Sequence, residues 1–281
     1  MMKAVKLSRL AYTLAALLLV SPLLAQAVGF GDKYWEIITD LGDEPAYVAL
    51  ATILYVGISR ELGAVALLSL ITSAWVNVYL KNLFALPRPP RELWKVEASG
   101  YGFPSGHAQT SSAFWVSVGF MLRSIPVLVL GAAIVALVAA SRVALGVHYV
   151  HDVVGGAVLG SLIAWLTATA LRRRELDGTR PAAALAAYGF AIPLLYLIYP
   201  DPTFVKMGGV ALGFSAYPLA RRHLSHNASA LIRLAVTALV LVAAFALTRF
   251  FDKQVPVLQF AGYALTTLLI VLSPALYKLR R

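Results

Sequence analysis

Long apolar runs alternate with short polar breaks along the whole chain. A bilayer core of about 30 Å is crossed by a helix of roughly 20 apolar residues, and the chain contains a series of runs near that length. They lie at residues 10–30, 45–59, 63–80, 105–122, 125–141, 150–171, 181–199, 204–220, 230–248 and 255–277. This pattern predicts an all-α integral membrane protein with about ten transmembrane helices, because backbone polar groups in lipid must be satisfied internally.

The composition agrees with a membrane protein. Hydrophobic residues make up 60% of the 281 residues and charged residues 13%, against about 45–50% and 25% in soluble domains. A net charge of +11 would suggest nucleic acid in a soluble protein, but here the basic residues are scattered between apolar runs, so we expect no nucleic-acid partner. The chain has no Cys, which excludes disulfides, thiolate metal ligands and a cysteine nucleophile.

The basic residues also predict the orientation in the cell membrane. Cytoplasmic loops carry an excess of Lys and Arg, and most of these residues, including the run 172–174, share one side if both chain ends are cytoplasmic. The first run follows Lys3, Lys6 and Arg9 and ends in small residues at Ala27, so residues 1–27 also fit a secretory signal peptide. We expect an uncleaved first helix, with cleavage after Ala27 as the alternative.

Three stretches place polar residues at the membrane boundary on the same predicted outer face. Ionisable groups at such positions are costly and suggest function. The stretches are Lys81 with Arg88-Pro89, then Pro104-Ser105-Gly106-His107, and then Ser141-Arg142 with His148 and Asp152. Each alone has a structural explanation: interfacial cations, a helix N-cap or an i,i+4 pair. Because all three fall on one face, we expect them to form one site.

The residue types in these stretches suit a phosphate group. Lys81, Arg88 and Arg142 can surround an anion with charge-assisted hydrogen bonds. Ser105 and the free N–H groups after it open a helix, where an anion is favoured, and Gly106 lets backbone approach a ligand closely. Such a site would stabilise a phosphoryl transition state without a metal or another cofactor.

Two histidines have distinct expected roles. His148 and Asp152 are one helical turn apart, so the carboxylate can hold one ring nitrogen and leave the other free to attack phosphorus, which would form a phosphohistidine. His107, on another helix, can protonate the leaving oxygen and later activate water. His151 lies beside Asp152 in sequence, and we expect it to be a surface or supporting residue.

At these residues the chain resembles the type 2 phosphatidic acid phosphatase superfamily, whose three-part signature matches in order. Members include lipid phosphate phosphatases, undecaprenyl diphosphate phosphatases, glucose-6-phosphatase and vanadium haloperoxidases. The resemblance covers about residues 10–171. It implies a metal-independent reaction with His148 as nucleophile, His107 as acid and base, and Asp152 as the residue that orients the nucleophile. The phosphate ligands that it implies are Lys81, Arg88, Ser105, Gly106 and Arg142.

The resemblance also implies a domain organisation. Residues 1–175 would be a six-helix phosphatase core, with the site at the outer ends of helices three to six; this is why we expect the first helix to be retained. Residues 176–281 would add about four accessory transmembrane helices whose role is open, as is the oligomeric state. Gly156-xxx-Gly160 and Gly209-xxx-Gly213 predict close helix packing.

The expected function is hydrolysis of a lipid phosphate or diphosphate at the extracytoplasmic membrane face. The lipid tail can stay in the bilayer while the head group enters the basic site, and a polyprenyl diphosphate is our first choice. Phosphatidic, phosphatidylglycerol and sphingoid phosphates follow. The alternatives are phosphotransfer from lipid to lipid and a non-catalytic lipid transporter or binding protein, although binding alone would not require His107, His148 and Asp152 together.

Overall fold

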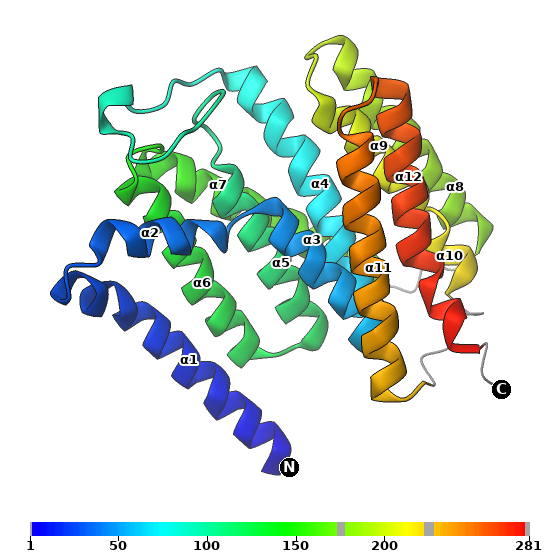
Figure 1. Ribbon diagram of the computed structural model, residues 1–281, viewed down its shortest axis with the longest axis horizontal. Coiled ribbons are helices and arrows are strands. Elements are labelled where there is room, and N and C mark those ends of the chain that lie inside the picture. Colours follow the sequence, from blue (N-terminus) through cyan, green and yellow to red (C-terminus); the bar gives the residue numbers. More distant parts are fainter. Residues whose placement is uncertain (1, 173–177, 222–227, 279–281) are drawn as a thin grey trace. The chain divides into compact units, whose positions relative to one another are not determined.

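The computed structural model describes residues 2–172, 178–221 and 228–278, and these residues form helices joined by loops, without a strand (Figure 1). The protein is therefore an all-α membrane protein, as predicted. In the described part of the chain, seven helices are long and apolar enough to cross a membrane. They are Leu7–Ala27, Arg60–Phe84, Ile125–Ala144, Val150–Arg172, Thr179–Leu197, Ala230–Phe251 and Pro256–Tyr277.

The three other predicted spans are helical but shorter. One is the apolar helix Glu44–Ile58, one is Gly106–Leu122 with 17 residues, and one begins at Pro202 and ends after 13 residues at Phe214. Gly106–Leu122 also carries a polar run, Gln109–Ser112, that is buried inside the protein. Hydropathy alone therefore overstates the number of long apolar helices.

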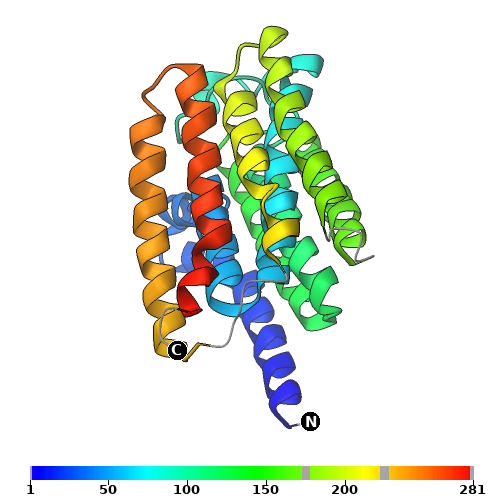
Figure 2. The same ribbon diagram turned by 90° about the vertical axis from the view of Figure 1, so that its right-hand side faces the viewer.

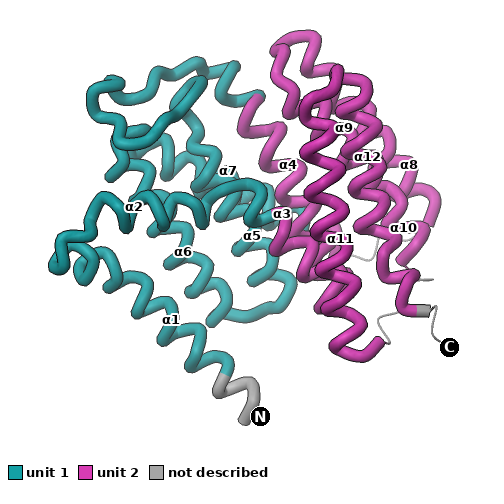
Figure 3. The backbone as a smooth tube through the Cα atoms, viewed as in Figure 1, with its two compact units in different colours: residues 1–47, 79–168 teal, residues 48–78, 169–281 magenta. Residues whose placement is uncertain are grey.

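The chain forms two compact units, and the first consists of residues 1–47 and 79–168 (Figure 3). Its helices are α1 (Met2–Ala27), α2 (Gly31–Asp40), the start of α3 (Glu44–Thr52), the end of α4 (Arg60–Phe84), the short η2 (Arg91–Leu93), α5 (Gly106–Leu122), α6 (Ile125–Ala144) and most of α7 (Val150–Arg172). In this unit α1 runs alongside α6, and α2 crosses α6 (Figure 1).

Glycines bring α5 and α7 of the first unit together. A Cβ atom added at Gly156 or Gly160 would meet the backbone of α5 or its N-cap, at the carbonyl oxygens of Ser105 and Gln109 respectively. The Ser112 hydroxyl also donates a 2.8 Å hydrogen bond to the Ala157 carbonyl. The predicted close packing at Gly156-xxx-Gly160 is thus confirmed, and it fixes the start of α5 against the first turns of α7.

The second unit consists of residues 48–78 and 169–281. It contains the end of α3, the π-helical η1 (Ile53–Ile58), most of α4, α8 (Thr179–Ala191), η3 (Ile192–Leu197), α9 (Pro202–Phe214), α10 (Tyr217–Ala220), α11 (Ala230–Phe251), α12 (Pro256–Leu272) and η4 (Ser273–Lys278). Figure 2 shows α11 and α12 as an antiparallel pair. Gly209 and Gly213 of α9 face backbone carbonyls of α12, which confirms their predicted role in packing.

The predicted boundary after residue 175 falls within residues 173–177, outside the described residues, so the division into a six-helix core and accessory helices stays a prediction. The helix α2 (Gly31–Asp40) was not predicted. It mixes Asp32, Lys33 and Glu36 with apolar residues over ten positions, which is too short and too polar for a membrane span.

Candidate active site

The three polar stretches meet at one end of the first unit. Lys81 lies in the last turn of α4 and Arg142 in the last turn of α6, while Ser105 precedes α5 and Asp152 lies in the first turn of α7. His148 lies in the link between α6 and α7. The Ser105 N–H donates a 3.0 Å hydrogen bond to the Asp152 carbonyl, which joins the second stretch to the third.

A buried histidine–aspartate pair lies at the centre of this site. His148 Nδ1 is 3.2 Å from Asp152 Oδ2, and the Tyr149 N–H donates to the same oxygen at 2.9 Å. On the other side of the ring, Nε2 lies 2.9 Å from Arg88 Nη1. Because a guanidinium can only donate, Nε2 must accept this hydrogen bond. The proton of the neutral ring is therefore on Nδ1, and the lone pair of Nε2 faces Arg88.

The surroundings of His148 keep its ring neutral. Burial lowers the pKa of His148, the hydrogen bond to Asp152 opposes this, and the positive charges of Arg88, Lys81 and Arg142 lower the pKa as well, so that it is about 4. Nε2, the ring nitrogen that does not contact Asp152, is thus unprotonated at neutral pH. An unprotonated Nε2 can act as a nucleophile.

This protonation state is directly measurable in the free protein. We expect the His148 ring signal to stay constant from about pH 7 down to about pH 5, because its pKa is about 4. The measurement is a pH titration of protein labelled at the histidine rings, with His148→Gln to assign the signal. A midpoint for His148 near 6.5, the ordinary value for histidine, would contradict this description of the site.

Backbone carbonyls hold two of the three cations. Arg88 donates from Nε to the Gly100 carbonyl at 3.0 Å, from Nη2 to Ser99 at 2.8 Å and from Nη1 to Val147 at 2.9 Å. Lys81 Nζ donates to the carbonyls of Tyr101 and Gly102 at 2.6 and 3.2 Å. The segment 99–102 therefore fixes both cations, a role that was not predicted from the sequence.

Two buried hydrogen-bond donors at the site have no partner among the described residues. They are Ser105 Oγ and Arg142 Nε. Ser105 occupies the N-cap position of α5, yet its side chain makes no capping hydrogen bond, so capping does not account for it. Buried donors without partners cost free energy, and the first N–H groups of α5 are also free of intrahelical partners. Oxygen atoms of an anion would satisfy all of these donors.

His107 has a partner that sequence reasoning missed. Its Nε2 lies 3.0 Å from Asp43 Oδ1, in the link between α2 and α3. Close by, Arg142 Nη1 donates a 2.7 Å hydrogen bond to the Thr39 hydroxyl at the end of α2. The signal in the sequence was a polar break at residues 39–44 on the predicted outer face, the same face as the three motifs.

His151 lies at the edge of the site. Its side chain is 62% exposed, and its Nε2 is 3.1 Å from Asp152 Oδ1 without hydrogen-bond geometry. The ring stacks on Tyr149, with the two ring planes 14° apart. This is the position expected for a surface or supporting residue.

Gly146 shapes the link that carries His148. It has a φ of 74°, and an added Cβ would collide with the Leu93 carbonyl. We therefore expect Gly146→Ala to displace the link and to lower the turnover of the site by about tenfold or more, since misplaced catalytic groups lose rate steeply. Gly29→Ala is the matched control, because Gly29 has a φ of 73° and open space around it. Equal turnover in the two variants would contradict this role.

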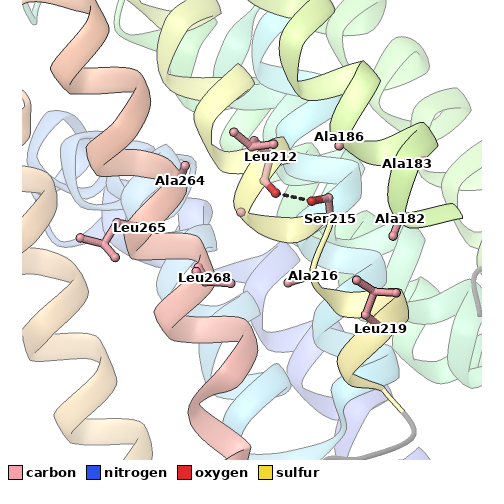
Figure 4. A pocket seen from close by; sticks show the side chains of 11 residues that line it. Ala182, Ala183, Ala186, Leu212, Ser215, Ala216, Leu219, Ala264, Leu265 and Leu268 are labelled. Carbon is pink, nitrogen blue, oxygen red and sulfur yellow. Dashed lines mark hydrogen bonds between the residues drawn. The ribbon is translucent and has the colours of Figure 1, made fainter. Parts of the chain in front are cut away.

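Apolar grooves lie in both units, and the one shown in Figure 4 contains none of the motif residues. It belongs to the second unit and has a volume of about 490 Å³. Its lining residues are Ala182, Ala183, Ala186, Leu212, Gly213, Ser215, Ala216, Leu219, Ala264, Leu265 and Leu268. The Ser215 hydroxyl is satisfied by the Leu212 carbonyl at 2.6 Å (Figure 4), so this groove offers no chemistry of its own.

A second groove, of about 470 Å³, runs along α5, α6 and α7 in the first unit. It includes Val153 and Val154, which directly follow Asp152 on α7, and it is otherwise lined mainly by small and apolar residues. An apolar groove of this kind accepts a hydrocarbon chain. Of the two grooves, it is the one lined by residues next to Asp152 in the sequence.

The fold and the site define a helical membrane protein with a buried histidine–aspartate pair among three cations. Residues 62–176 match the sequence model of the PAP2 superfamily. The resemblance predicted from the three motifs is thereby confirmed.

Two curated relatives are similar over part of their length. The chain is 34% identical over 113 residues to phosphatidylglycerophosphatase B of Bacillus subtilis, covering 37% of this chain. It is 32% identical over 116 residues to an undecaprenyl-diphosphatase of Sulfolobus acidocaldarius, covering 39% of this chain. In both cases the match spans 55% of the relative.

A solved structure is similar as well. It is the crystal structure of a transmembrane PAP2 type phosphatidylglycerolphosphate phosphatase from Bacillus subtilis, with 25% sequence identity and a TM-score of 0.43. The match covers 62% of this chain and 98% of that chain.

Proposed function

We propose that the protein is a lipid phosphatase that hydrolyses a lipid phosphate or diphosphate through a phosphohistidine, without a metal or another cofactor. The observation that carries the proposal is the state of His148. Its Nδ1 is held by Asp152, its Nε2 is unprotonated with its lone pair facing Arg88, and it lies among cations that suit a phosphate group. The match of residues 62–176 to the sequence model of the PAP2 superfamily supports the same conclusion.

The reaction has two steps in which the same groups act in turn. In the first, His148 Nε2 attacks phosphorus, the bond from phosphorus to the leaving oxygen breaks, and His107 gives that oxygen a proton. In the second, His107 removes a proton from water, the water oxygen attacks phosphorus, and the bond between phosphorus and Nε2 breaks. Lys81, Arg88, Arg142, Ser105 and the N–H groups that follow Ser105 at Gly106 and His107 would bind the phosphate oxygens and stabilise the charge of both transition states.

The groove beside the site supports a lipid as the substrate. The head group would lie among the cations while the tail follows the groove that includes Val153 and Val154. A polyprenyl diphosphate remains our first choice, and the names of the two relatives add phosphatidylglycerol phosphate as the closest competitor.

The excess of basic residues on one side supports an orientation with both chain ends in the cytoplasm and the site on the extracytoplasmic face. A cysteine introduced beside the site, for example Ser99→Cys in this cysteine-free chain, would then react in whole cells with a thiol reagent that does not cross membranes. Protection of that cysteine until the cells are broken would contradict this orientation.

The function is tested by phosphate release from purified protein. The panel contains a polyprenyl diphosphate, phosphatidic acid, phosphatidylglycerol phosphate and a sphingoid phosphate, each with and without EDTA. We expect release from at least one lipid, unchanged by EDTA and inhibited by vanadate, which resembles the phosphoryl transition state. Strict dependence on a divalent cation, or no release from any lipid, would contradict the proposal.

The same assay distinguishes the two alternatives. A lipid-to-lipid phosphotransferase would need a second lipid as acceptor and would form a new phosphorylated lipid in place of free phosphate. A lipid transporter or binding protein would bind the lipids and release nothing.

A further inference from the structure

The link between α2 and α3 packs directly on the ring of His107. Asp43 Oδ1 lies 3.0 Å from His107 Nε2. The residue before it, Gly42, leaves no room for a side chain, because an added Cβ would lie 2.9 Å from His107 Cδ2 and 2.6 Å from Val138 Cγ1. The backbone of the link is therefore held against the ring, and the contact of Asp43 follows from that close approach.

The end of α2 fixes the same link from the other side. Thr39 is buried, and its hydroxyl accepts the 2.7 Å hydrogen bond from Arg142 Nη1. Thr39 thus ties the link to one of the cations of the site, while Asp43 ties it to His107. Both contacts lie within the first unit, although these residues are far from α5 and α6 in sequence.

His107 needs a negative partner in this environment. A general acid must carry a proton before it can give one to a leaving oxygen. Burial disfavours the protonated form of the His107 ring, and so do the charges of Arg142, Arg88 and Lys81 and the neighbouring His148. Asp152 lies against His148, whereas Asp43 lies against His107 itself.

The two histidine–aspartate pairs of the site differ in exposure. Asp152 is fully buried, whereas the Asp43 side chain is 52% exposed and the His107 side chain 27% exposed. Burial suits a histidine that must stay neutral to attack phosphorus. Access to water suits a histidine that must gain and lose a proton in each turnover.

The carboxyl of Asp43 is also a strong hydrogen-bond acceptor. Burial raises the pKa of Asp43, and repulsion from Asp40 raises it further, while Arg142 lowers it. A more basic carboxylate holds the N–H of an imidazole more firmly.

We propose that Asp43 is a positioning residue that pairs with His107 and stabilises its protonated ring for transfer to the leaving oxygen. This inference rests on the proposed phosphatase function. Asp43 holds the proton on Nε2 of His107. The proton on Nδ1 of His107 passes to the leaving oxygen as the bond from phosphorus to that oxygen breaks. In the second step Nδ1 takes a proton back from the attacking water, so the ring ends the cycle as it began.

The test compares two substrates that differ in their need for an acid. A long-chain alkyl phosphate leaves as an alkoxide and needs a proton, whereas p-nitrophenyl phosphate leaves as a stable phenolate. We expect Asp43→Asn to lower kcat for the alkyl phosphate by about 30-fold, a part of the 10²–10⁴-fold that general acid catalysis supplies. For the aryl phosphate kcat should change by less than about threefold, with KM nearly constant for both substrates.

Two further variants serve as controls. Asp32→Asn removes an exposed carboxylate from the other end of α2, where it pairs with Lys95 at 2.7 Å, and is expected to leave both rates unchanged. Asp43→Glu keeps the carboxylate and is expected to recover part of the rate on the alkyl phosphate. An equal loss on both substrates, no loss at all, or a gain of activity in Asp43→Asn would each overturn the proposal.

A measurement without turnover separates this inference from the proposed function. The ring nitrogen signals of His107 report its protonated fraction in the free protein, and we expect a smaller fraction in Asp43→Asn than in the wild type at the same pH. If the wild type releases no phosphate from either substrate, the proposed function fails while this comparison still tests the pair. An unchanged protonated fraction overturns the role of Asp43.

Discussion

Replacing His148 with alanine is expected to lower kcat by about four orders of magnitude or more. The substitution removes the nitrogen that attacks phosphorus, and no other group can form the covalent intermediate in its place. KM should change by less than about threefold, because Lys81, Arg88 and Arg142 remain to bind the phosphate group. The measurement is phosphate release across a range of substrate concentrations, with inorganic phosphate binding as the check that the site is still folded.

His151 provides the matched control for this experiment. It lies three residues from His148 and is exposed, and its ring approaches the other oxygen of Asp152. We expect His151→Ala to retain activity within about threefold of the wild type. Comparable losses in the two variants, or an active His148→Ala, would contradict the assignment of the nucleophile.

Asp152→Asn is expected to lower kcat by about 100- to 1,000-fold with KM unchanged or lower. As Nε2 bonds to phosphorus, the His148 ring becomes positive, and it does so beside Lys81, Arg88 and Arg142. The Asp152 carboxylate stabilises that charge in the transition state, and an asparagine of the same shape cannot. Anionic substrate should bind at least as well, because the substitution removes a negative charge from the site.

Asp32→Asn is the control for the change in charge. Asp32 is exposed and pairs with Lys95 at 2.7 Å, away from His148, so this variant should keep the wild-type kcat. A raised KM with a normal kcat in Asp152→Asn would mean that Asp152 acts on binding, which would contradict its proposed role.

The motif residues could be located from the sequence because their arrangement is mostly local. His148 and Asp152 are four residues apart across the start of α7, and Ser105 directly precedes α5. Lys81 and Arg142 come at the ends of apolar runs that were themselves recognisable. Local spacing and the ends of the apolar runs therefore predicted which side chains would meet. The apolar runs themselves predicted the all-α class.

The missed features depend on contacts that spacing does not encode. The segment 99–102 holds Arg88 and Lys81 through backbone carbonyls, which every residue type possesses. Asp43 and Thr39 reach the site because α2 crosses α6, and α2 carries neither the length nor the hydropathy of a span. Three of the ten predicted spans are also shorter than a long apolar helix. In one of them, the apolar run does not reveal that polar residues such as Gln109 lie buried inside the protein.

The central claim is that His148 carries the phosphoryl group during the reaction. Its most direct test is to mix the enzyme with lipid substrate labelled in the phosphoryl group, stop the reaction in base, where phosphohistidine persists, and locate the label by mass spectrometry. We expect the label on His148 in the wild type. With labelled p-nitrophenyl phosphate, whose leaving group needs no proton, we expect more label on His148 in His107→Ala, because water is no longer activated there. Turnover with no label on His148, or label on another residue, would contradict this account.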